Sequence, residues 1–254
     1  MLCYIVNLEN AVERKTHMDK ILEKMPYFEK KYVKAVDGRL LSENEKNTLF
    51  DKEAFRKRYL REPSSSEIGC SLSHQQCYEM LCNGNENYAM IFEDDIVMKY
   101  DVQEIVERLE KVYDTNSPVV ILLSGWYWYK NKIKFSSDIT LTNVYDGFLA
   151  QSYLINKSAA KVMKEDKIGV LSDDWNYFIR KGVKIYGLKP HAVDQKWSVD
   201  FQSSINHENA LFKGHYISKI RLYSRELIRK LYQFAGHYEP CDYHTICAEK
   251  QDGK

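Results

Sequence analysis

Short apolar runs alternate with amphipathic stretches along most of the chain. Residues 2–6 are apolar throughout, residues 11–24 place apolar positions among charges as a surface helix does, and residues 32–36 form a second strand-like run. This order predicts a βαβ opening. Residues 88–92 and 119–123 are again short and continuously apolar, which is typical of central strands buried on both faces.

Later segments continue the alternation. Residues 151–155 and 183–187 read as strands, with a helix over about 173–180 between them. Two serine and glutamate pairs three residues apart, Ser42 with Glu45 and Ser64 with Glu67, fit the capping box and predict two helix starts. The charged stretch 51–63, which ends in proline and serine, is interpreted as a mobile loop over a site. The whole pattern predicts an α/β fold in one domain with a C-terminal tail.

Charge and composition exclude several classes of protein. In 254 residues, 37 Lys and Arg nearly balance 36 Asp and Glu, so the formal net charge of +1 gives no field suited to a nucleic-acid partner. The apolar start is interrupted at Asn7 and Glu9, and no later apolar run approaches the roughly 18 residues of a membrane span. We therefore expect a cytoplasmic protein with reduced cysteines, since none of the six forms a C-x-x-C pair.

Three acids, Glu93, Asp94 and Asp95, directly follow the apolar run 88–92. Carboxylates two residues apart past a strand end can converge on Mg²⁺ or Mn²⁺ and leave coordination positions for phosphate oxygens. The alternative is a solvated turn or a helix start, where acids are also favourable.

A second acidic pair, Asp173 and Asp174, precedes Trp175. One interpretation makes a carboxylate of this pair the base that accepts a proton from a sugar hydroxyl, with the indole as an apolar platform. The other makes Asp173 an ordinary helix cap, as Ser172 beside it also suggests.

Several segments, taken in order, resemble glycosyltransferase family 25, which includes bacterial lipooligosaccharide galactosyltransferases and is related to the collagen galactosyltransferases. The resemblance covers about residues 3 to 206. The segments are Ile5-Val6-Asn7-Leu8 with Arg14, Ala35-Val36-Asp37-Gly38, the run from Ser66 to His74, Ile91-Phe92-Glu93-Asp94-Asp95-Ile96, Ala150 to Ile155 with Ser158-Ala159-Ala160, Asp174-Trp175 and Ser203-Ser204-Ile205.

The resemblance implies a GT-A fold, in which a Rossmann-like sheet flanked by helices binds a nucleotide sugar and a divalent metal, Mn²⁺ or Mg²⁺. It implies UDP-galactose as donor, a lipooligosaccharide, LPS or capsular saccharide as acceptor, and an inverting reaction. By this resemblance Glu93 and Asp95 are metal ligands, and His207, near the end of the matching region, is a third ligand. Asp174 is the base, with Asp173 as its alternative. Donor binding falls to Asn7, Arg14, Asp37, Glu67, Ser71, His74 and Asp94. For His74 a buried core histidine is the rival interpretation.

Residues 213–254 are interpreted as a tail, separate from a catalytic domain over 1–212. Between Lys213 and Lys230 six basic residues stand against one acid, while Ile217, Ile220, Tyr223, Leu227 and Leu231 recur at helical spacing. Such a helix can rest on anionic lipid, which would suit a lipid-linked acceptor, or it can pack on the domain with its basic side solvated.

Two other functions compete with sugar transfer. A sugar-nucleotide nucleotidyltransferase shares the metal and the sheet, but it normally has a glycine-rich loop after its first strand, where this chain has Asn7-Leu8-Glu9-Asn10. A non-enzymatic glycan-binding module could stack saccharides on the aromatic run 126–129.

Overall fold

The computed structural model describes residues 1–110, 116–195 and 216–240. The helices are α1 Val12–Leu22, α2 Glu43–Leu49, α3 Lys52–Tyr59, α4 Ser65–Asn83, α5 Val102–Glu110, α6 Lys157–Met163, α7 Trp175–Arg180 and α8 Tyr216–Phe234. The strands are β1 Leu2–Asn7, β2 Glu29–Lys34, β3 Tyr88–Glu93, β4 Ile96–Met98, β5 Val119–Leu122, β6 Trp126–Lys134, β7 Thr140–Phe148, β8 Ser152–Asn156, β9 Lys184–Lys189, β10 Val193–Gln195 and β11 Tyr238–Glu239.

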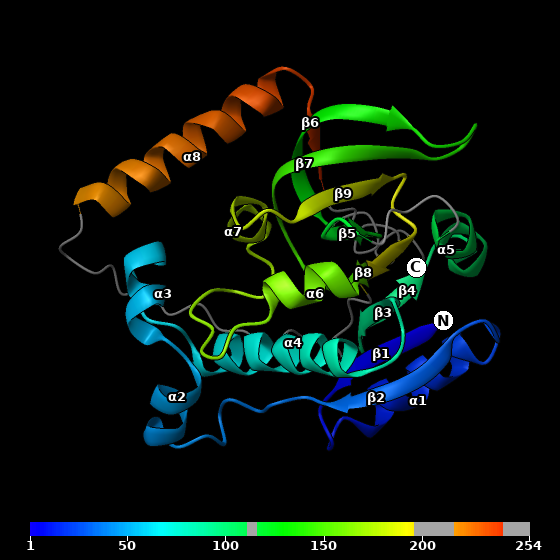
Figure 1. Cartoon of the computed structure of the whole chain (residues 1–254), viewed down its shortest axis with the longest axis horizontal. Coiled ribbons are helices and arrows are strands. Elements are labelled where there is room, and N and C mark those ends of the chain that lie inside the picture. The colour runs from blue at the N-terminus through cyan, green and yellow to red at the C-terminus, as the bar shows by residue number, and fades with distance from the viewer. Residues whose placement is uncertain (111–115, 196–215, 241–254) are drawn as a thin grey trace, which may run out of the picture.

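A nine-stranded mixed sheet runs through the centre of the molecule in the order β11-β6-β7-β9-β5-β8-β3-β1-β2, with helices on both sides (Figure 1). β1 pairs in parallel with β2 and with β3, so the carboxyl ends of these three strands meet at one edge. β8 runs antiparallel between β3 and β5, which brings its first residues to that same edge. The α/β sheet flanked by helices that the sequence predicts is confirmed.

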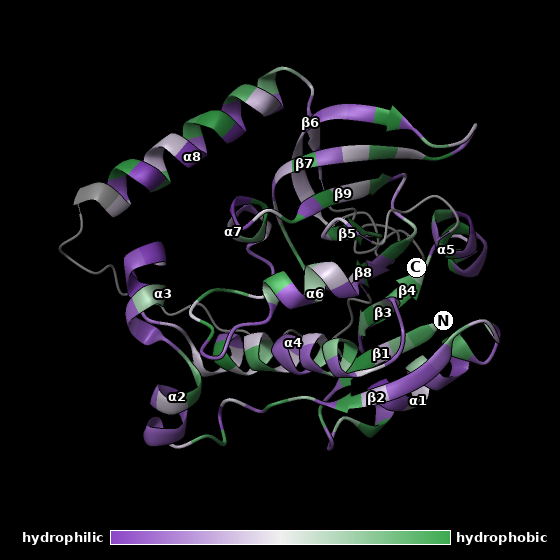
Figure 2. Cartoon of the chain, in the orientation of Figure 1, coloured by the Kyte–Doolittle hydropathy of each residue, from purple (hydrophilic) through white to green (hydrophobic). Residues whose placement is uncertain are grey.

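The core has two layers because the central strands bury alternate side chains on opposite faces. Tyr4 and Ile91 belong to the apolar layer beneath α4, α6 and α7, whereas Ile5 and Met90 belong to the layer beneath α1 and α5. Figure 2 shows the result: the inner strands β1 and β3 are mostly hydrophobic, while the edge strand β2 is largely hydrophilic.

Local signals in the sequence correctly predicted most helix starts but misjudged one segment. Both capping boxes form, at Ser42 and at Ser64. The loop expected over 51–63 is wrong, because residues 52–59 are the helix α3. Asp51 caps it by accepting a hydrogen bond from Ala54 N–H, and Phe55 is fully buried, so one apolar anchor and one cap outweigh the charged composition.

The long helix α8 lies along one side of the molecule and contacts β6 and α3 (Figure 1). The boundary that we expect at residue 212 lies outside the described residues. Within the described part of the chain, no helix combines the length and the apolar character that a membrane crossing requires.

α8 is held by arginines that reach two buried acids. Arg225 binds both carboxylate oxygens of Asp146 through Nε, at 2.6 Å, and Nη2, and its Nη2 also donates to Asp174 Oδ1 at 2.9 Å. Arg229 adds a bond to Asp146 Oδ2 at 2.8 Å, and Arg58 of α3 pairs with Asp174. We call these five residues the arginine latch. It joins α3, α7, β7 and α8.

The latch sets the charge state of Asp174. Burial alone would raise the pKa of this carboxyl, but the hydrogen bond from Arg58 and the charge of Arg225 lower its pKa to about 2. Both acids of the latch are almost fully buried, so each depends on its arginines for compensation.

Removing an arginine from the latch should destabilise the fold strongly. We expect Arg225→Met to lower the free energy of unfolding by about 3–5 kcal/mol, because Asp146 and Asp174 would each lose a partner while staying buried. Urea unfolding followed by tryptophan fluorescence measures the change. Lys230→Met, an exposed position on the same helix, is the matched control, and equal midpoints for the two variants would contradict the latch.

Candidate active site

A cavity of about 440 Å³ opens where the carboxyl ends of β1, β2 and β3 meet. This is the position at which open α/β sheets usually bind ligands. Its walls come from the three strand ends, α4, the turn before β8 and the turn before α7. They are Val6, Leu8, Arg14, Ala35, Val36, Asp37, Gly38, Arg39, Ser66, Glu67, Cys70, Ser73, Glu93, Asp94, Asp95, Leu149, Ala150, Gln151, Leu171, Ser172, Asp173 and Gln195.

One wall depends on two glycines that let backbone touch backbone. A Cβ added to Gly38 would lie 1.9 Å from the carbonyl oxygen of Ser65, and one added to Gly69 would lie 2.3 Å from that of Val36. The loop after β2 therefore rests directly on α4. This contact holds Asp37 at the cavity.

In the acidic triplet, Asp94 is the member whose charge is compensated. Its Oδ1 accepts a hydrogen bond from Arg14 Nη1 at 2.8 Å, and its Oδ2 accepts one from Asn7 Nδ2 at 2.7 Å. Asn7 ends β1 and Arg14 belongs to α1, so three residues that we predict to bind the donor lie together. Asn7 and Arg14 thus hold Asp94 in place. We call Glu93, Asp94 and Asp95 the acidic corner of the cavity.

Asp95 is buried but only partly compensated. Its Oδ2 accepts hydrogen bonds from Gln195 at 2.9 Å and from Arg14 at 3.3 Å. Its Oδ1 is buried without a hydrogen-bond partner among the described residues. Burial and the neighbouring carboxylate of Glu93 raise the pKa of Asp95 to about 7. The acidic corner therefore carries negative charge that its hydrogen-bond partners in the protein do not fully balance.

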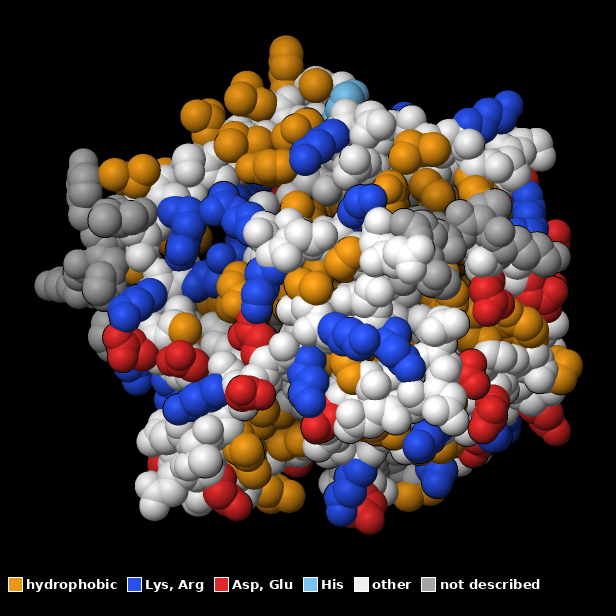
Figure 3. Space-filling view, viewed as in Figure 1, with side chains coloured by type: hydrophobic (Ala, Val, Ile, Leu, Met, Phe, Trp, Pro, Cys, Tyr) orange, Lys and Arg blue, Asp and Glu red, His pale blue; other side chains and the backbone are white. Residues whose placement is uncertain are grey.

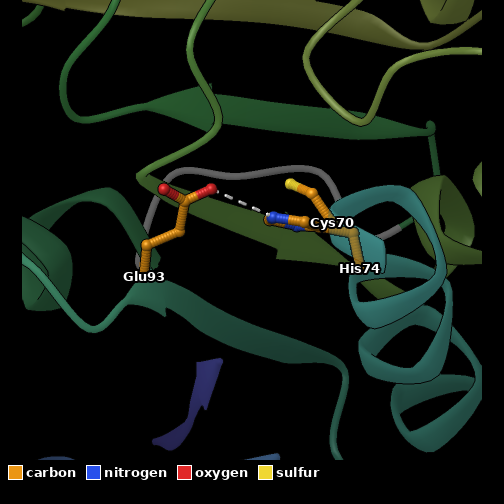
Figure 4. A group of neighbouring side chains, drawn as sticks. All are labelled: Cys70, His74 and Glu93. Atoms are coloured by element: carbon orange, nitrogen blue, oxygen red, sulfur yellow. Dashed lines mark hydrogen bonds and ion pairs between the residues drawn. The ribbon is translucent and has the colours of Figure 1, made fainter. Parts of the chain in front are cut away.

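Glu93 extends into the cavity and is positioned by His74 (Figure 4). His74 is fully buried; its Nε2 lies 3.4 Å from Glu93 Oε1 and its Nδ1 lies 2.7 Å from the hydroxyl of Tyr153. The structure therefore places this histidine in the core, directly behind a cavity acid. It does not line the cavity itself.

Cys70 lies beside His74 and Glu93, close enough for the three to form a possible metal group (Figure 4). Its Sγ lies 3.2 Å from the hydroxyl of Ser172, and burial raises the pKa of the thiol far above its usual range. A neutral thiol is a poor ligand, and Mg²⁺ and Mn²⁺ prefer oxygen. The oxygen donors Glu93 and Asp95 suit such a cation better.

Two further acids of the cavity are held by arginines. Arg39 binds Asp37 through two hydrogen bonds of 2.8 and 2.7 Å, and lowers the pKa of that carboxyl. Arg61 binds Glu67 in the same bidentate way. Ser71, by contrast, donates to the carbonyl oxygen of Val170 and is buried away from the cavity.

The adjacent acids Asp173 and Asp174 lie in different environments. Asp173 lines the cavity, and its Oδ2 accepts a hydrogen bond of 3.0 Å from the N–H of Leu149, a residue in the left-handed region at φ 71°. Burial raises the pKa of Asp173 to about 6. Asp174 caps α7 and belongs to the arginine latch, outside the cavity lining.

The aromatic run 126–129 is mostly packed. Tyr127, Trp128 and Tyr129 are buried, while Trp126 is 43% exposed. A stacking platform of four rings is therefore not available, and this removes the feature on which a glycan-binding module rested.

Sequence reasoning found the acids of the cavity but missed the residues that set their charge. Arg39, Arg61 and Gln195 had no periodicity or motif that pointed to a partner. Only Arg39, two residues from Asp37, was close enough in sequence to be suspected. The expected late ligand His207 lies outside the described residues.

The chain is similar in sequence to known glycosyltransferases. A putative glycosyltransferase of Haemophilus influenzae is 26% identical over 168 residues, which cover 64% of this chain and 56% of that protein. A glycosyltransferase 25 family member of Aedes aegypti is 26% identical over 176 residues, covering 65% of this chain and 28% of that protein. The chain therefore spans about half or less of these relatives' length.

Among solved structures, A197 from STIV aligns with a TM-score of 0.37 and 11% identity, over 82% of this chain and 98% of that one. A TM-score this low does not indicate a shared fold. The sequence profile of one family, in contrast, matches residues 1–170, well over half of the chain, and so confirms the resemblance seen in the motifs. The chain belongs to glycosyltransferase family 25 (LPS biosynthesis protein).

Proposed function

We propose that the protein is a metal-dependent inverting glycosyltransferase of the GT-A type that transfers a sugar from a nucleoside diphosphate sugar to a saccharide acceptor. The observation that carries this proposal is one cavity lined both by acids with unbalanced charge, Glu93 and Asp95, and by a separate acid, Asp173, whose pKa is about 6. Sugar transfer releases an anionic diphosphate, which a cation held by Glu93 and Asp95 would neutralise. It also removes a proton from the acceptor hydroxyl, which Asp173 would accept. A nucleotidyltransferase has no need of the second acid.

Glu93 and Asp95 fit a Mn²⁺ or Mg²⁺ ion. Both offer carboxylate oxygens, and the Oδ1 of Asp95, which none of the described residues hydrogen-bonds, is a buried acceptor that a cation would satisfy. A bound cation would neutralise the diphosphate and stabilise its departure. Asp94 already accepts hydrogen bonds from Arg14 and Asn7 on its two oxygens, so we assign it, with these two partners, to supporting the donor side of the cavity.

Asp37 and Glu67 are proposed to contact the donor. Each lines the cavity, and each is fixed by a bidentate arginine, which leaves acceptor lone pairs in defined positions for ribose or sugar hydroxyls. His74 positions Glu93, and Ser71 holds α4 against the segment that contains Val170.

We assign the base to Asp173. The acceptor oxygen attacks the anomeric carbon, its proton passes to Asp173, and the bond from that carbon to the diphosphate breaks, with the electron pair leaving on the diphosphate. A carboxyl with a pKa of about 6 is ionised near neutrality yet basic enough to take the proton. Asp174, with a pKa of about 2 and two arginines on it, is a weaker base and is engaged elsewhere.

We also propose that the sugar is galactose, that the nucleotide is UDP and that the acceptor is a lipopolysaccharide precursor. Their support is the family to which the chain belongs and the family's association with LPS biosynthesis.

Asp95→Asn should abolish metal-dependent binding of UDP. The variant keeps the shape of the side chain but removes a charged oxygen ligand, so we expect the affinity for UDP in the presence of Mn²⁺ to fall more than tenfold. Calorimetric titration with and without Mn²⁺ measures this. Glu104→Gln, an exposed acid on α5, is the control. Unchanged Mn²⁺ dependence in Asp95→Asn would exclude the proposed corner.

Asp173→Asn should retain UDP binding and lose transfer. Removing a general base typically lowers the rate by 10²–10⁴-fold, so we expect a loss of about that size in turnover with UDP-galactose. Asp174→Asn should instead lower thermal stability, since it weakens the arginine latch. The assignment is refuted if Asp173→Asn turns over normally.

Transfer by the wild-type protein should fall as the pH drops below about 6. Asp173 is the active base only when ionised, and its raised pKa means that protonation begins at a higher pH than for an ordinary aspartate. Turnover at saturating Mn²⁺ and donor is measured from pH 5 to 8. UDP binding measured over the same range shows the effect of protonating the acidic corner, so that this effect can be distinguished from protonation of Asp173. A residual rate in Asp173→Asn that keeps the same pH dependence would contradict the prediction.

A further inference from the structure

Helix α8 exposes its apolar side to solvent. Ile220, Tyr223, Leu227, Leu231 and Phe234 follow one another at spacings of three and four residues, so they form one stripe along the helix. Each is at least 52% exposed, and Phe234 is 95% exposed. Figure 3 shows hydrophobic side chains gathered along the edge of the molecule where α8 lies.

The opposite side of α8 faces the domain and carries the arginines of the helix, with Tyr232 packed there on Tyr145. Arg225, which is 8% exposed, and Arg229 enter the arginine latch, and Arg221 donates to the carbonyl oxygens of Lys57 and Arg58 on α3. A surface helix normally buries its apolar stripe and solvates its charges. α8 does the reverse, because the buried acids Asp146 and Asp174 require arginines.

Single exposed apolar residues are ordinary, but a continuous stripe of five marks a surface that meets something apolar. Five of the eleven large hydrophobic side chains that are exposed in the described part of the chain belong to this stripe. Packing of α8 on the domain does not require the apolar stripe, because the arginine latch holds the helix through its other side.

Positive charge borders the stripe. Lys219 and Lys230 are exposed on one flank at helical spacing. Glu226, the one acid of α8, is exposed on the same flank and pairs with Arg229 at 3.4 Å. An apolar stripe edged by cations matches the boundary between acyl chains and phosphate groups in a bilayer.

We propose that α8 docks the protein on an anionic lipid surface, with the stripe entering the acyl boundary and Lys219 and Lys230 lying at the lipid phosphates. The docking does not rest on the sugar chemistry proposed above. Because Arg221, Arg225 and Arg229 face the domain, the apolar side of the helix is the one that meets the lipid.

A second copy of the chain is a less suitable occupant. Two copies of α8 that paired antiparallel through their stripes would bring the flank of Lys219 and Lys230 against the same flank of the other helix. The two lysines of each flank outnumber its one acid, Glu226, which already pairs with Arg229, so like charges would face each other and oppose association. Lipid phosphates would neutralise these same cations.

Vesicle co-sedimentation tests the proposal. We expect the wild-type protein to bind vesicles of phosphatidylcholine mixed with phosphatidylglycerol, and the double variant Leu227→Gln/Leu231→Gln to bind them at least tenfold more weakly. Both leucines are exposed, so the variant should fold, and unchanged UDP binding and thermal stability verify this. The matched control is Leu40→Gln/Leu49→Gln, which removes two exposed leucines outside α8 and should bind like the wild type.

The flanking charges are tested separately. Lys219→Gln/Lys230→Gln should reduce binding to the mixed vesicles severalfold and leave the weaker binding to pure phosphatidylcholine unchanged, because only the electrostatic part is removed. Failure of the wild-type protein to bind either vesicle would overturn the proposal, as would wild-type binding by the leucine variant. So would sedimentation in solution that showed a dimer in the wild type and a monomer in the leucine variant.

Discussion

The structure depends on how two neighbouring carboxylates are separated. Asp173 and Asp174 are adjacent in sequence, yet one lines the cavity and the other lies among arginines behind it. Asp174 can be buried because Arg58 and Arg225 compensate it, and those arginines arrive on α3 and α8. The pairing fixes the turn before α7, and the fixed turn presents Asp173 to the cavity. Fold stability and the proposed chemistry are thus coupled in two consecutive residues.

The same logic governs the acidic triplet. Asp94 is satisfied by Arg14 and Asn7, and this holds the end of β3 against β1 and α1. Asp95 is left with a buried oxygen that has no hydrogen-bond partner in the described part of the chain, and with a pKa of about 7. A protein tolerates such an oxygen when something else completes its environment. A carboxylate whose charge is compensated by neighbouring side chains has a structural role, whereas one that is not compensated is a candidate metal ligand. The residue type alone does not show which of the two an aspartate is.

The sequence predicted features that depend on local periodicity. The apolar run 88–92 became β3, and both capping boxes formed where the serine and glutamate spacing indicated. It failed at residues 51–63, where charge suggested a loop but Phe55 supplies a buried anchor. It could not supply the partners of Asp174, since Arg58 lies 116 residues away in the chain and Arg225 lies 51 away. Pairing over such separations is decided by the topology of the sheet.

Helix α8 shows most clearly why an amphipathic pattern does not determine orientation. Helical periodicity defines two sides, and turning the helix by half a revolution exchanges them without changing the pattern. The usual rule buries the apolar side, but here Asp146 is fully buried on β7 and has no compensation among the described residues except Arg225 and Arg229. Leaving that charge unpaired would cost about 3–5 kcal/mol, and Arg225 and Arg229 lie on the side of the helix opposite to the stripe, so their pairing with Asp146 turns the stripe outward. The buried acid therefore sets the rotation of the helix, and the exposed stripe follows from it.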